Sequence, residues 1–279
     1  MKKILIIGNT SNLAKALINQ LATFEIYTAG RNGADYYFDA EEETLDEKVL
    51  KSKFDVIINT MASFGSNSTS DYYKTEKINV LGCLKICELA KMTECKHLVQ
   101  ISSIFQKYKE NAPYYNIYSV SKRHADELIK LYCKQEKIPY TILMPSQIYD
   151  FKGKCEKHQS FLYSIIRQVK NNQNITIYGT NDAKRNYIYI GDIVQIIEKV
   201  IDMNVLGEYC CCALKDTRIS ELVSATKKYT HSGSKIIFDN TKNNILDLPD
   251  VYDNDLYKII NYMPQMPIEN GVEQVLKEM

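Results

Sequence analysis

The pair of side chains with the clearest potential for catalysis is a tyrosine and a lysine four residues apart, Tyr118 and Lys122. On a helix, residues at this spacing lie one turn apart on the same face. A phenol ionises at about pH 10, and an ammonium beside it stabilises the phenolate and lowers its pKa. The pair could therefore exchange a proton with a hydroxyl or carbonyl group. The alternative is a solvated pair on a helix surface, because the chain's 21 tyrosines make chance matches common.

The segments that would position this pair follow the order of an open α/β sheet. The continuous apolar run from Ile4 to Ile7 predicts a strand buried on both faces, and Gly8 then opens a turn into a helix through Leu21. A later strand beginning at His97 ends in Ser102-Ser103. Because ligands of such sheets bind at the carboxyl ends of the strands, we expect these serines to lie near the Tyr-Lys helix.

Nearly from end to end, the chain resembles the extended short-chain dehydrogenases/reductases, of the NAD-dependent epimerase/dehydratase type that acts on nucleotide sugars. The motifs that carry the resemblance are Gly8 to Ala14, Ile78 to Gly82, Ser102-Ser103, Tyr118 to Lys122, Met144-Pro145 and Arg185 to Asp192. The resemblance implies a doubly wound parallel sheet (a Rossmann fold) with a smaller C-terminal α/β lobe. We expect residues 1–150 and about 187–215 to bind the dinucleotide, and residues 151–186 and about 216–279 to form the substrate lobe.

By the same resemblance, the reaction centre is a Ser-Tyr-Lys site. Tyr118 is expected to act as acid and base, Lys122 to lower the pKa of Tyr118 and hold the cofactor ribose, and Ser103 to hold the reacting oxygen. The sugar-nucleotide dehydratases carry an acidic pair directly after this serine or threonine. The chain has Ile104 and Phe105 there, which argues against elimination of water.

The cofactor turn departs from the family pattern Gly-x-x-Gly-x-x-Gly. Only Gly8 is kept, with Ser11 and Ala14 at the other two positions. Such a turn offers free N–H groups and a positive dipole end to a pyrophosphate. Arg31 follows the predicted second strand, Glu25 to Ala29, with no acid before it. An acid near this point holds the ribose 2′-hydroxyl, whereas an arginine accommodates a 2′-phosphate, so we expect NADP, with NAD as the alternative.

The remaining site residues are assigned by resemblance. The expected cofactor-binding residues are Gly8, Thr10, Ser11, Asn12, Leu13, Arg31, Asp39, Ala40, Thr60, Met61, Ala62, Asn79, Ile101, Tyr118, Lys122, Pro145 and Ile148. The expected substrate-binding residues are Ser63, Phe64, Ser103, Gln147 and Arg185. The planar guanidinium of Arg185 suits bidentate binding of a nucleotide diphosphate. Asp192, at the end of the same block, is expected to cap the following helix, residues 193–203.

Composition excludes several other classes of protein. A net charge of +1 provides no global field for nucleic acid or an anionic membrane, and no apolar run approaches the roughly 20 residues of a membrane span. The eight cysteines show no zinc-site spacing with histidine, so we expect no metal and reduced thiols in a cytoplasmic protein. The family resemblance implies a homodimer through the helices that bear Asn79 and Tyr118.

These observations lead to three hypotheses about function. The first is reduction of a 4-keto nucleotide sugar by NADPH, because Arg31 favours the 2′-phosphate and the loss of two glycines loosens the pyrophosphate grip, so that cofactor can exchange. The second is a nucleotide-sugar 4-epimerase with tightly bound NAD. The third is a dinucleotide-binding sensor or scaffold without turnover; such relatives usually lose the tyrosine or the lysine, and both are present here.

Overall fold

The centre of the fold is an eight-stranded sheet in the order β12-β7-β6-β5-β1-β2-β3-β4. The structure, a computed structural model, describes residues 1–250 and 252–279. The strands of this sheet are β1 Lys3–Ile7, β2 Glu25–Gly30, β3 Tyr36–Asp39, β4 Thr44–Leu45, β5 Val56–Asn59, β6 His97–Ile101, β7 Tyr140–Pro145 and β12 Gly207–Cys211. All neighbouring strands are parallel except β3 and β4. The order reverses between β1 and β5, which confirms the predicted doubly wound sheet.

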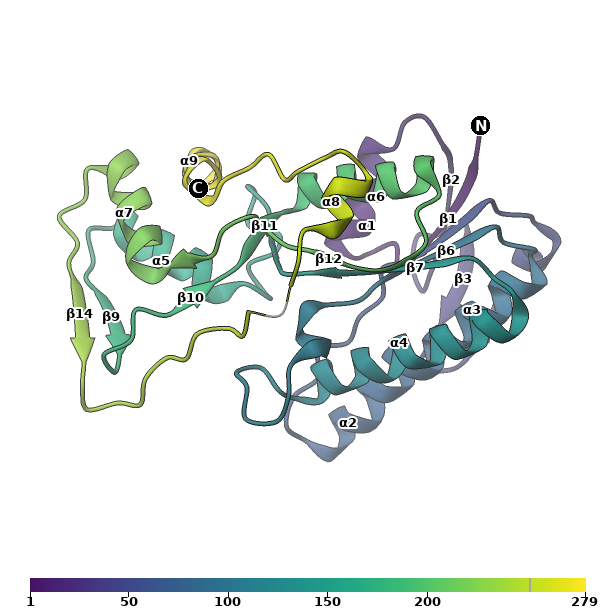
Figure 1. The fold of residues 1–279 in the computed structure, drawn as a ribbon, viewed down its shortest axis with the longest axis horizontal. Coiled ribbons are helices and arrows are strands. Elements are labelled where there is room, and N and C mark those ends of the chain that lie inside the picture. The colour runs from purple at the N-terminus through teal and green to yellow at the C-terminus, as the bar shows by residue number, and fades with distance from the viewer. Residues whose placement is uncertain (251) are drawn as a thin grey trace.

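Helices cover both faces of the sheet, as Figure 1 shows. Helices α1 Asn12–Gln20 and α6 Ile190–Met203 lie on one face, and α2 Thr69–Glu76, α3 Gly82–Met92 and α4 Ile117–Glu136 lie on the other. A π-helical turn, η2 Lys77–Leu81, joins α2 to α3. Alternate residues of β1 enter two separate cores, with Ile4 and Ile6 on the α1 side and Leu5 and Ile7 on the α3 side. Because both faces are buried, the strand is apolar at every one of these positions.

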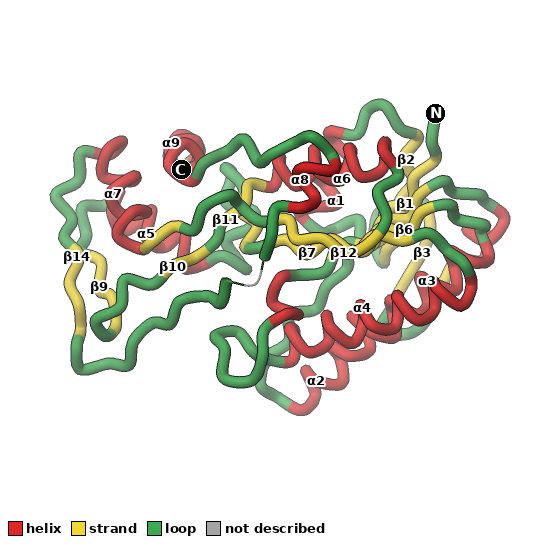
Figure 2. The backbone as a smooth tube through the Cα atoms, in the orientation of Figure 1, coloured by secondary structure: helices red, strands yellow, loops and turns green. Residues whose placement is uncertain are grey.

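The later part of the chain forms small sheets and helices beyond the carboxyl ends of the strands (Figure 2). Its elements are β8 Gln147–Tyr149, α5 Ser160–Lys170, β9 Ile175–Tyr178, β10 Lys184–Arg185, β11 Tyr187–Tyr189, β13 Thr217–Arg218, α7 Ile219–Thr230, β14 Ile236–Asp239, α8 Asp255–Ile259 and α9 Ile268–Glu278. Two 3₁₀ turns, η1 Glu47–Lys51 and η3 Ile104–Lys107, complete the described elements. The pairs β8–β11, β9–β14 and β10–β13 make three two-stranded sheets.

The expected division into two units stays a prediction, and one contact crosses it. Helix α8 belongs to the segment expected in the substrate lobe, yet Tyr257 is buried and donates its hydroxyl to the carbonyl oxygen of Cys212, 2.5 Å away, next to β12. The C-terminal segment therefore also packs on the large sheet.

The prediction that Asp192 caps a helix is wrong. Helix α6 begins at Ile190, so Asp192 lies inside its first turn. The carboxylate instead accepts hydrogen bonds from the Tyr262 hydroxyl at 2.7 Å and from the backbone N–H groups of Gln265 and Met266 at 2.8 and 3.1 Å. Its function in the fold is to fasten the segment between α8 and α9 to the helix.

All eight cysteines are free and buried. Over residues 1–250 and 252–279, no helix is long and apolar enough to cross a membrane. Within the same ranges, no group of three or more histidine, cysteine, aspartate or glutamate side chains could hold a metal ion.

Candidate active site

A cavity of about 620 Å³ opens at the carboxyl ends of the strands, at the point where the strand order reverses. Nineteen of the predicted site residues line it: Gly8, Thr10, Ser11, Asn12, Leu13, Arg31, Asp39, Ala40, Thr60, Met61, Ala62, Phe64, Ile101, Ser103, Tyr118, Lys122, Pro145, Gln147 and Ile148. The structure therefore gathers most of the predicted residues into one place, while their individual roles stay predictions. Ser63, Asn79 and Arg185 lie outside the lining.

Helix α4 places Tyr118 and Lys122 at the cavity wall. Its N-cap, Asn116, and Ser119 form a capping box, in which Asn116 Oδ1 accepts from Ser119 N at 3.2 Å and Ser119 Oγ accepts from Asn116 N at 3.0 Å. This box fixes the first turn, which carries Tyr118. Tyr118 and Lys122 are only 9% and 2% exposed. The pair is therefore not the solvated surface pair of the alternative interpretation.

The lysine is directed toward backbone carbonyls. Its ammonium donates to the carbonyl oxygen of Ile101 at 2.9 Å and to that of Met61 at 3.3 Å, and lies 6.0 Å from the centroid of the Tyr118 ring. Burial lowers the pKa of Lys122. These contacts join the ends of β5 and β6 to α4 through one buried charge.

The expected lowering of the tyrosine pKa is wrong for this structure. Burial raises the pKa of Tyr118 to about 12, and interaction with the Ser103 hydroxyl offsets only part of that rise. The spacing placed the ammonium near the phenol, but loss of solvent around the phenol outweighs that proximity. At neutral pH Tyr118 is therefore protonated, which makes it a proton donor.

A buried carboxyl group behind the pair was missed in the sequence. Asp126 is 1% exposed and accepts a hydrogen bond from Ser102 Oγ at 2.5 Å. Burial raises its pKa to about 7, although the charge of Lys122 acts in the opposite direction. The signal was present: Tyr118, Lys122 and Asp126 repeat at four-residue spacing and so share one helix face.

The raised pKa of Asp126 predicts a pH-dependent stability. The free carboxyl ionises at about pH 4, so between that pH and about 7 the unfolded chain loses a proton that the folded chain keeps, and the free energy of unfolding falls as pH rises. Asp126→Asn keeps an acceptor for Ser102 but cannot ionise. Relative to wild type, the variant is expected to gain about 2–3 kcal/mol between pH 5 and pH 8, at roughly 1.4 kcal/mol per pKa unit. Urea unfolding at both pH values measures this; an unchanged difference would contradict it.

Asn79 braces the loop after β5 from inside. Its Nδ2 donates to the carbonyl oxygen of Ser63 at 2.8 Å and to Ser121 Oγ at 2.9 Å, and its Oδ1 accepts from Ser63 N at 2.7 Å. Asn79 and the backbone of Ser63 bond to each other in this network, and neither residue lines the cavity. The loop thus holds Ala62 and Phe64 at the wall.

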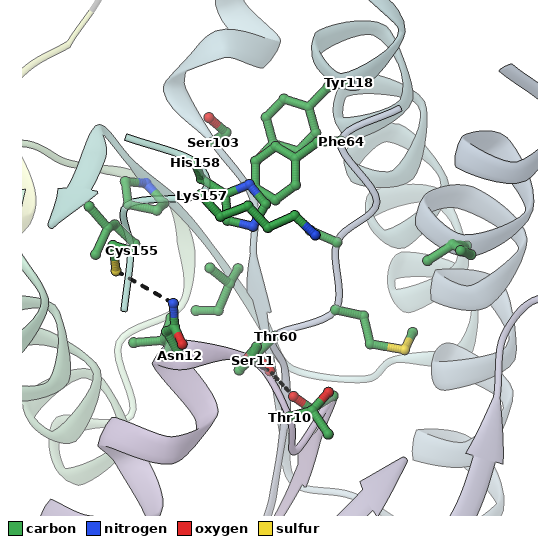
Figure 3. A pocket seen from close by; sticks show the side chains of 18 of the residues that line it. Thr10, Ser11, Asn12, Thr60, Phe64, Ser103, Tyr118, Cys155, Lys157 and His158 are labelled. Atoms are coloured by element: carbon green, nitrogen blue, oxygen red, sulfur yellow. Dashed lines mark hydrogen bonds between the residues drawn. The ribbon is translucent and has the colours of Figure 1, made fainter. Parts of the chain in front are cut away.

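Phe64 covers the phenol of Tyr118 in a stack of three rings (Figure 3). Its ring stacks on Tyr118, with centroids 4.6 Å apart and an interplanar angle of 19°, and on His158, at 4.0 Å and 20°. His158 comes from the loop of residues 151–159, which contributes Lys154, Lys157 and Gln159 to the lining as well. The sequence offered no periodic pattern that would have joined this loop to the site.

Arg185 is separated from the cavity by its own contacts. It is 5% exposed, and its Nη1 donates to the carbonyl oxygens of Lys184 and Leu246 at 2.7 and 2.9 Å. The guanidinium lies 5.9 Å from the ring centroid of Tyr114 and 5.8 Å from that of Phe161. Its predicted contact with a nucleotide diphosphate stays a prediction.

The residues around β1 fit a dinucleotide. Gly8 has φ +87°, and a Cβ there would lie 3.0 Å from Thr60 Oγ1 and 3.1 Å from Met61 N, so only glycine leaves this cradle open. Ser11, in place of a glycine, caps α1 by accepting from Ala14 N at 3.0 Å, and its hydroxyl lies 2.9 Å from that of Thr60. The N-terminus of α1 therefore faces the open part of the cavity beside Gly8, where its free N–H groups can bind phosphate.

A cradle for phosphate at the switch point of a doubly wound sheet, next to Ser103, Tyr118 and Lys122, defines an enzyme that works with a nicotinamide dinucleotide. Residues 4–209 match the sequence model of the NAD dependent epimerase/dehydratase family, and the chain belongs to this family. The third hypothesis, a sensor or scaffold without turnover, is therefore set aside.

Proteins similar to this chain include enzymes that act on nucleotide sugars. The chain is 26% identical over 238 residues to CDP-abequose synthase of Salmonella muenchen, with 82% of this chain and 79% of that protein covered. A UDP-glucuronic acid 4-epimerase from Bacillus cereus, solved with NAD, has a TM-score of 0.78 at 17% identity, covering 99% and 96% of the two chains. The structure of RMD from Pseudomonas aeruginosa with NADPH has a TM-score of 0.77 at 16% identity, covering 100% and 98%. The names of the first two proteins indicate different reactions, and the two structures hold different cofactors, NAD and NADPH.

Proposed function

We propose that this enzyme reduces a 4-keto nucleotide sugar with NADPH as the donor. The observation that carries the proposal is the position of Arg31, which lines the cavity directly after β2, where the chain reads Ala29-Gly30-Arg31-Asn32 without an acid. An arginine at this point accommodates a 2′-phosphate. The relative solved with NADPH supports this choice of cofactor, and the relative solved with NAD supports the alternative.

The chain's own residues supply the proton that such a reduction needs. When bound, the nicotinamide supplies the hydride. Tyr118, protonated at neutral pH, gives its proton to the developing alkoxide, and the Ser103 hydroxyl donates a hydrogen bond to the same oxygen. The charge of Lys122 stabilises the phenolate that is left, which then regains its proton from solvent. Carbonyl, hydride and proton together give the alcohol.

The surroundings of Ser103 support reduction over elimination. Ile104, fully buried, and Phe105, which lines the cavity, stand where the dehydratases carry their acidic pair. Among the described lining residues, the carboxylates are Asp39, the last residue of β3, and Glu41, two residues later. No acid beside Ser103 is therefore available to remove water from a sugar.

Stoichiometry tests the proposal. The purified protein is incubated with a panel of 4-keto nucleotide sugars and of the corresponding nucleotide sugars, with and without NADPH, and absorbance of the reduced cofactor is followed together with product. We expect one NADPH consumed per product and no reaction without it. If the protein instead carries tightly bound NAD and interconverts two sugars with no added cofactor, the reductase proposal fails and the 4-epimerase stands.

Cofactor choice yields a separate prediction for Arg31. If its guanidinium meets a 2′-phosphate, wild type should bind NADPH about tenfold to hundredfold more tightly than NADH, since a charge-assisted hydrogen bond contributes about 1.5–3 kcal/mol. Arg31→Ala should remove this preference. Fluorescence titration of both cofactors measures it, and Lys15→Ala, an exposed cation of α1 outside the lining, is the control. Equal affinities in wild type would overturn the assignment.

Assembly and location belong to the same proposal. The family implies a homodimer through the helices that bear Asn79 and Tyr118, which are η2, continued by α3, and α4. Exposed apolar side chains of these elements, Leu81, Met92 and Leu131, support such a contact. Sedimentation velocity would show a dimer, and a monomer at micromolar concentration would contradict it. The free thiols of all eight cysteines support the cytoplasm as the location.

A further inference from the structure

The loop of residues 151–159, called here the basic loop, forms one wall of the cavity and carries three lysines. Its side chains Lys154, Cys155, Lys157, His158 and Gln159 line the space. In Figure 3, Lys157 and His158 lie across the pocket from Thr10 and Ser11, whereas Cys155 lies beside Asn12. The family resemblance had given the loop no part in the site.

The basic loop is held in place by a carboxylate at its root. Asp150 Oδ2 accepts from the backbone N–H groups of Lys152 and Lys154, each at 3.1 Å, and Oδ1 accepts from Cys155 N at 2.7 Å. The Tyr163 hydroxyl also contacts Oδ1 at 2.9 Å.

A second tether fixes the loop over the cofactor cradle. Asn12, the first residue of α1, donates its Nδ2 to the carbonyl oxygen of Lys154 at 2.7 Å, and the same Nδ2 lies 3.8 Å from Cys155 Sγ. The basic loop and the N-terminus of α1 therefore face the same part of the cavity. A ligand group between them meets both.

Two lysines of the basic loop line this space: Lys154, whose carbonyl oxygen accepts from Asn12, and Lys157. Figure 3 shows the Lys157 side chain reaching into the pocket beside Phe64 and His158. In the described ranges, its ammonium forms no ion pair and no hydrogen bond with the protein, and its charge helps to lower the pKa of His158. Lys122 and Arg185, in contrast, already donate to backbone carbonyls.

A diphosphate would provide the negatively charged partner that the Lys157 ammonium lacks. It brings two negative charges into the cavity, whereas the N-terminus of α1 offers only about half a positive charge. We propose that Lys157 binds a diphosphate group opposite the α1 N-terminus, so that the ligand is held between the helix and the basic loop. That group belongs either to the dinucleotide or to the nucleotide sugar; only the second source rests on the proposed function.

Binding measurements on intact variants test this without reference to turnover. Lys157→Gln removes the charge, Lys157→Arg keeps it, and Lys152→Gln is the matched control, because Lys152 lies in the same loop outside the lining. NADPH and NADH are titrated by fluorescence, and UDP, CDP, dTDP and GDP are titrated by calorimetry. Urea unfolding verifies that each variant is folded.

In Lys157→Gln we expect about a tenfold to hundredfold loss of affinity for one ligand class, largely recovered in Lys157→Arg, with less than a twofold change in Lys152→Gln. Loss for NADPH and NADH alone assigns the dinucleotide diphosphate, and loss for the nucleoside diphosphates alone assigns the nucleotide sugar. If both classes bind Lys157→Gln as tightly as wild type, the inference is overturned while the proposed reductase stands. If wild type binds no dinucleotide, both fail.

Discussion

Replacing Tyr118 by phenylalanine is expected to lower the turnover number about 10²–10⁴-fold, the range for loss of a general acid. The substitution removes only the hydroxyl that, with its pKa raised to about 12, holds the transferable proton. The phenyl ring can keep its stacking contact with Phe64, whose centroid lies 4.6 Å away. Cofactor affinity and the free energy of unfolding should therefore change little.

Three measurements separate chemistry from structure in this variant. Steady-state turnover gives the catalytic loss, titration with NADPH gives cofactor affinity, and urea unfolding gives stability. Tyr115→Phe is the matched control, because Tyr115 lies shortly before α4, is exposed and does not line the cavity. Full activity in Tyr118→Phe would remove Tyr118 from the mechanism. A loss in Tyr115→Phe as large as in Tyr118→Phe would point to the pre-helix segment instead.

The order of strands could be predicted because the sequence carries it locally. Runs such as Ile4 to Ile7 are apolar at every position only when a strand is covered on both faces, and the sheet shows both cores. Once a helix is assumed, the four-residue spacing of Tyr118 and Lys122 places both side chains on one face. Residues at the carboxyl ends of parallel strands necessarily meet at one edge, which explains why most of the predicted set lines one cavity.

The pKa of Tyr118 and the use of Arg185 could not be predicted in the same way. Spacing places Lys122 near the phenol, but the pKa depends on how much solvent the whole fold removes, and that is set by distant segments such as the loop of Phe64. Arg185 donates to Leu246 from a segment 61 residues later. A motif identifies the residue type, whereas partners so far along the chain emerge only from the tertiary structure.

The basic loop shows a similar limit. In the sequence, its lysines have the pattern of an ordinary charged turn, placed after the regular alternation of strands and helices ends. Their approach to the site depends on two contacts that no pattern marks, the hydrogen bonds from backbone groups to Asp150 and the one from Asn12 to Lys154. Asp126 is the opposite case, because its four-residue spacing from Lys122 places it on the same helix face and can be found in the sequence.

Lys122→Met is expected to lower turnover about 10²–10³-fold, the usual effect of removing one group that stabilises developing charge. It should also weaken cofactor binding, because Lys122 is assigned to the ribose. Methionine approximates the length of the lysine stem but cannot donate to the carbonyl oxygens of Ile101 and Met61, at 2.9 and 3.3 Å. The Ile101 carbonyl oxygen keeps a longer bond from Gln100 Nε2 at 3.4 Å, but loss of the lysine donor still costs about 1–3 kcal/mol, so stability should fall as well.

A second substitution separates the lost charge from the lost chemistry. The positive charge of Lys122 lowers the pKa of Asp126, so in Lys122→Met the buried carboxyl has lost the cation that favours its ionised form. Adding Asp126→Asn removes the carboxyl, and we expect the double variant at pH 8 to be more stable than Lys122→Met alone, yet equally slow. Lys130→Met is the control. Lys130 lies farther along α4, and its ammonium pairs with Glu127 of the same helix and with Glu208 of β12. If the double variant recovered turnover together with stability, Lys122 would act through charge balance in the fold, and its assignment to the reaction would be wrong.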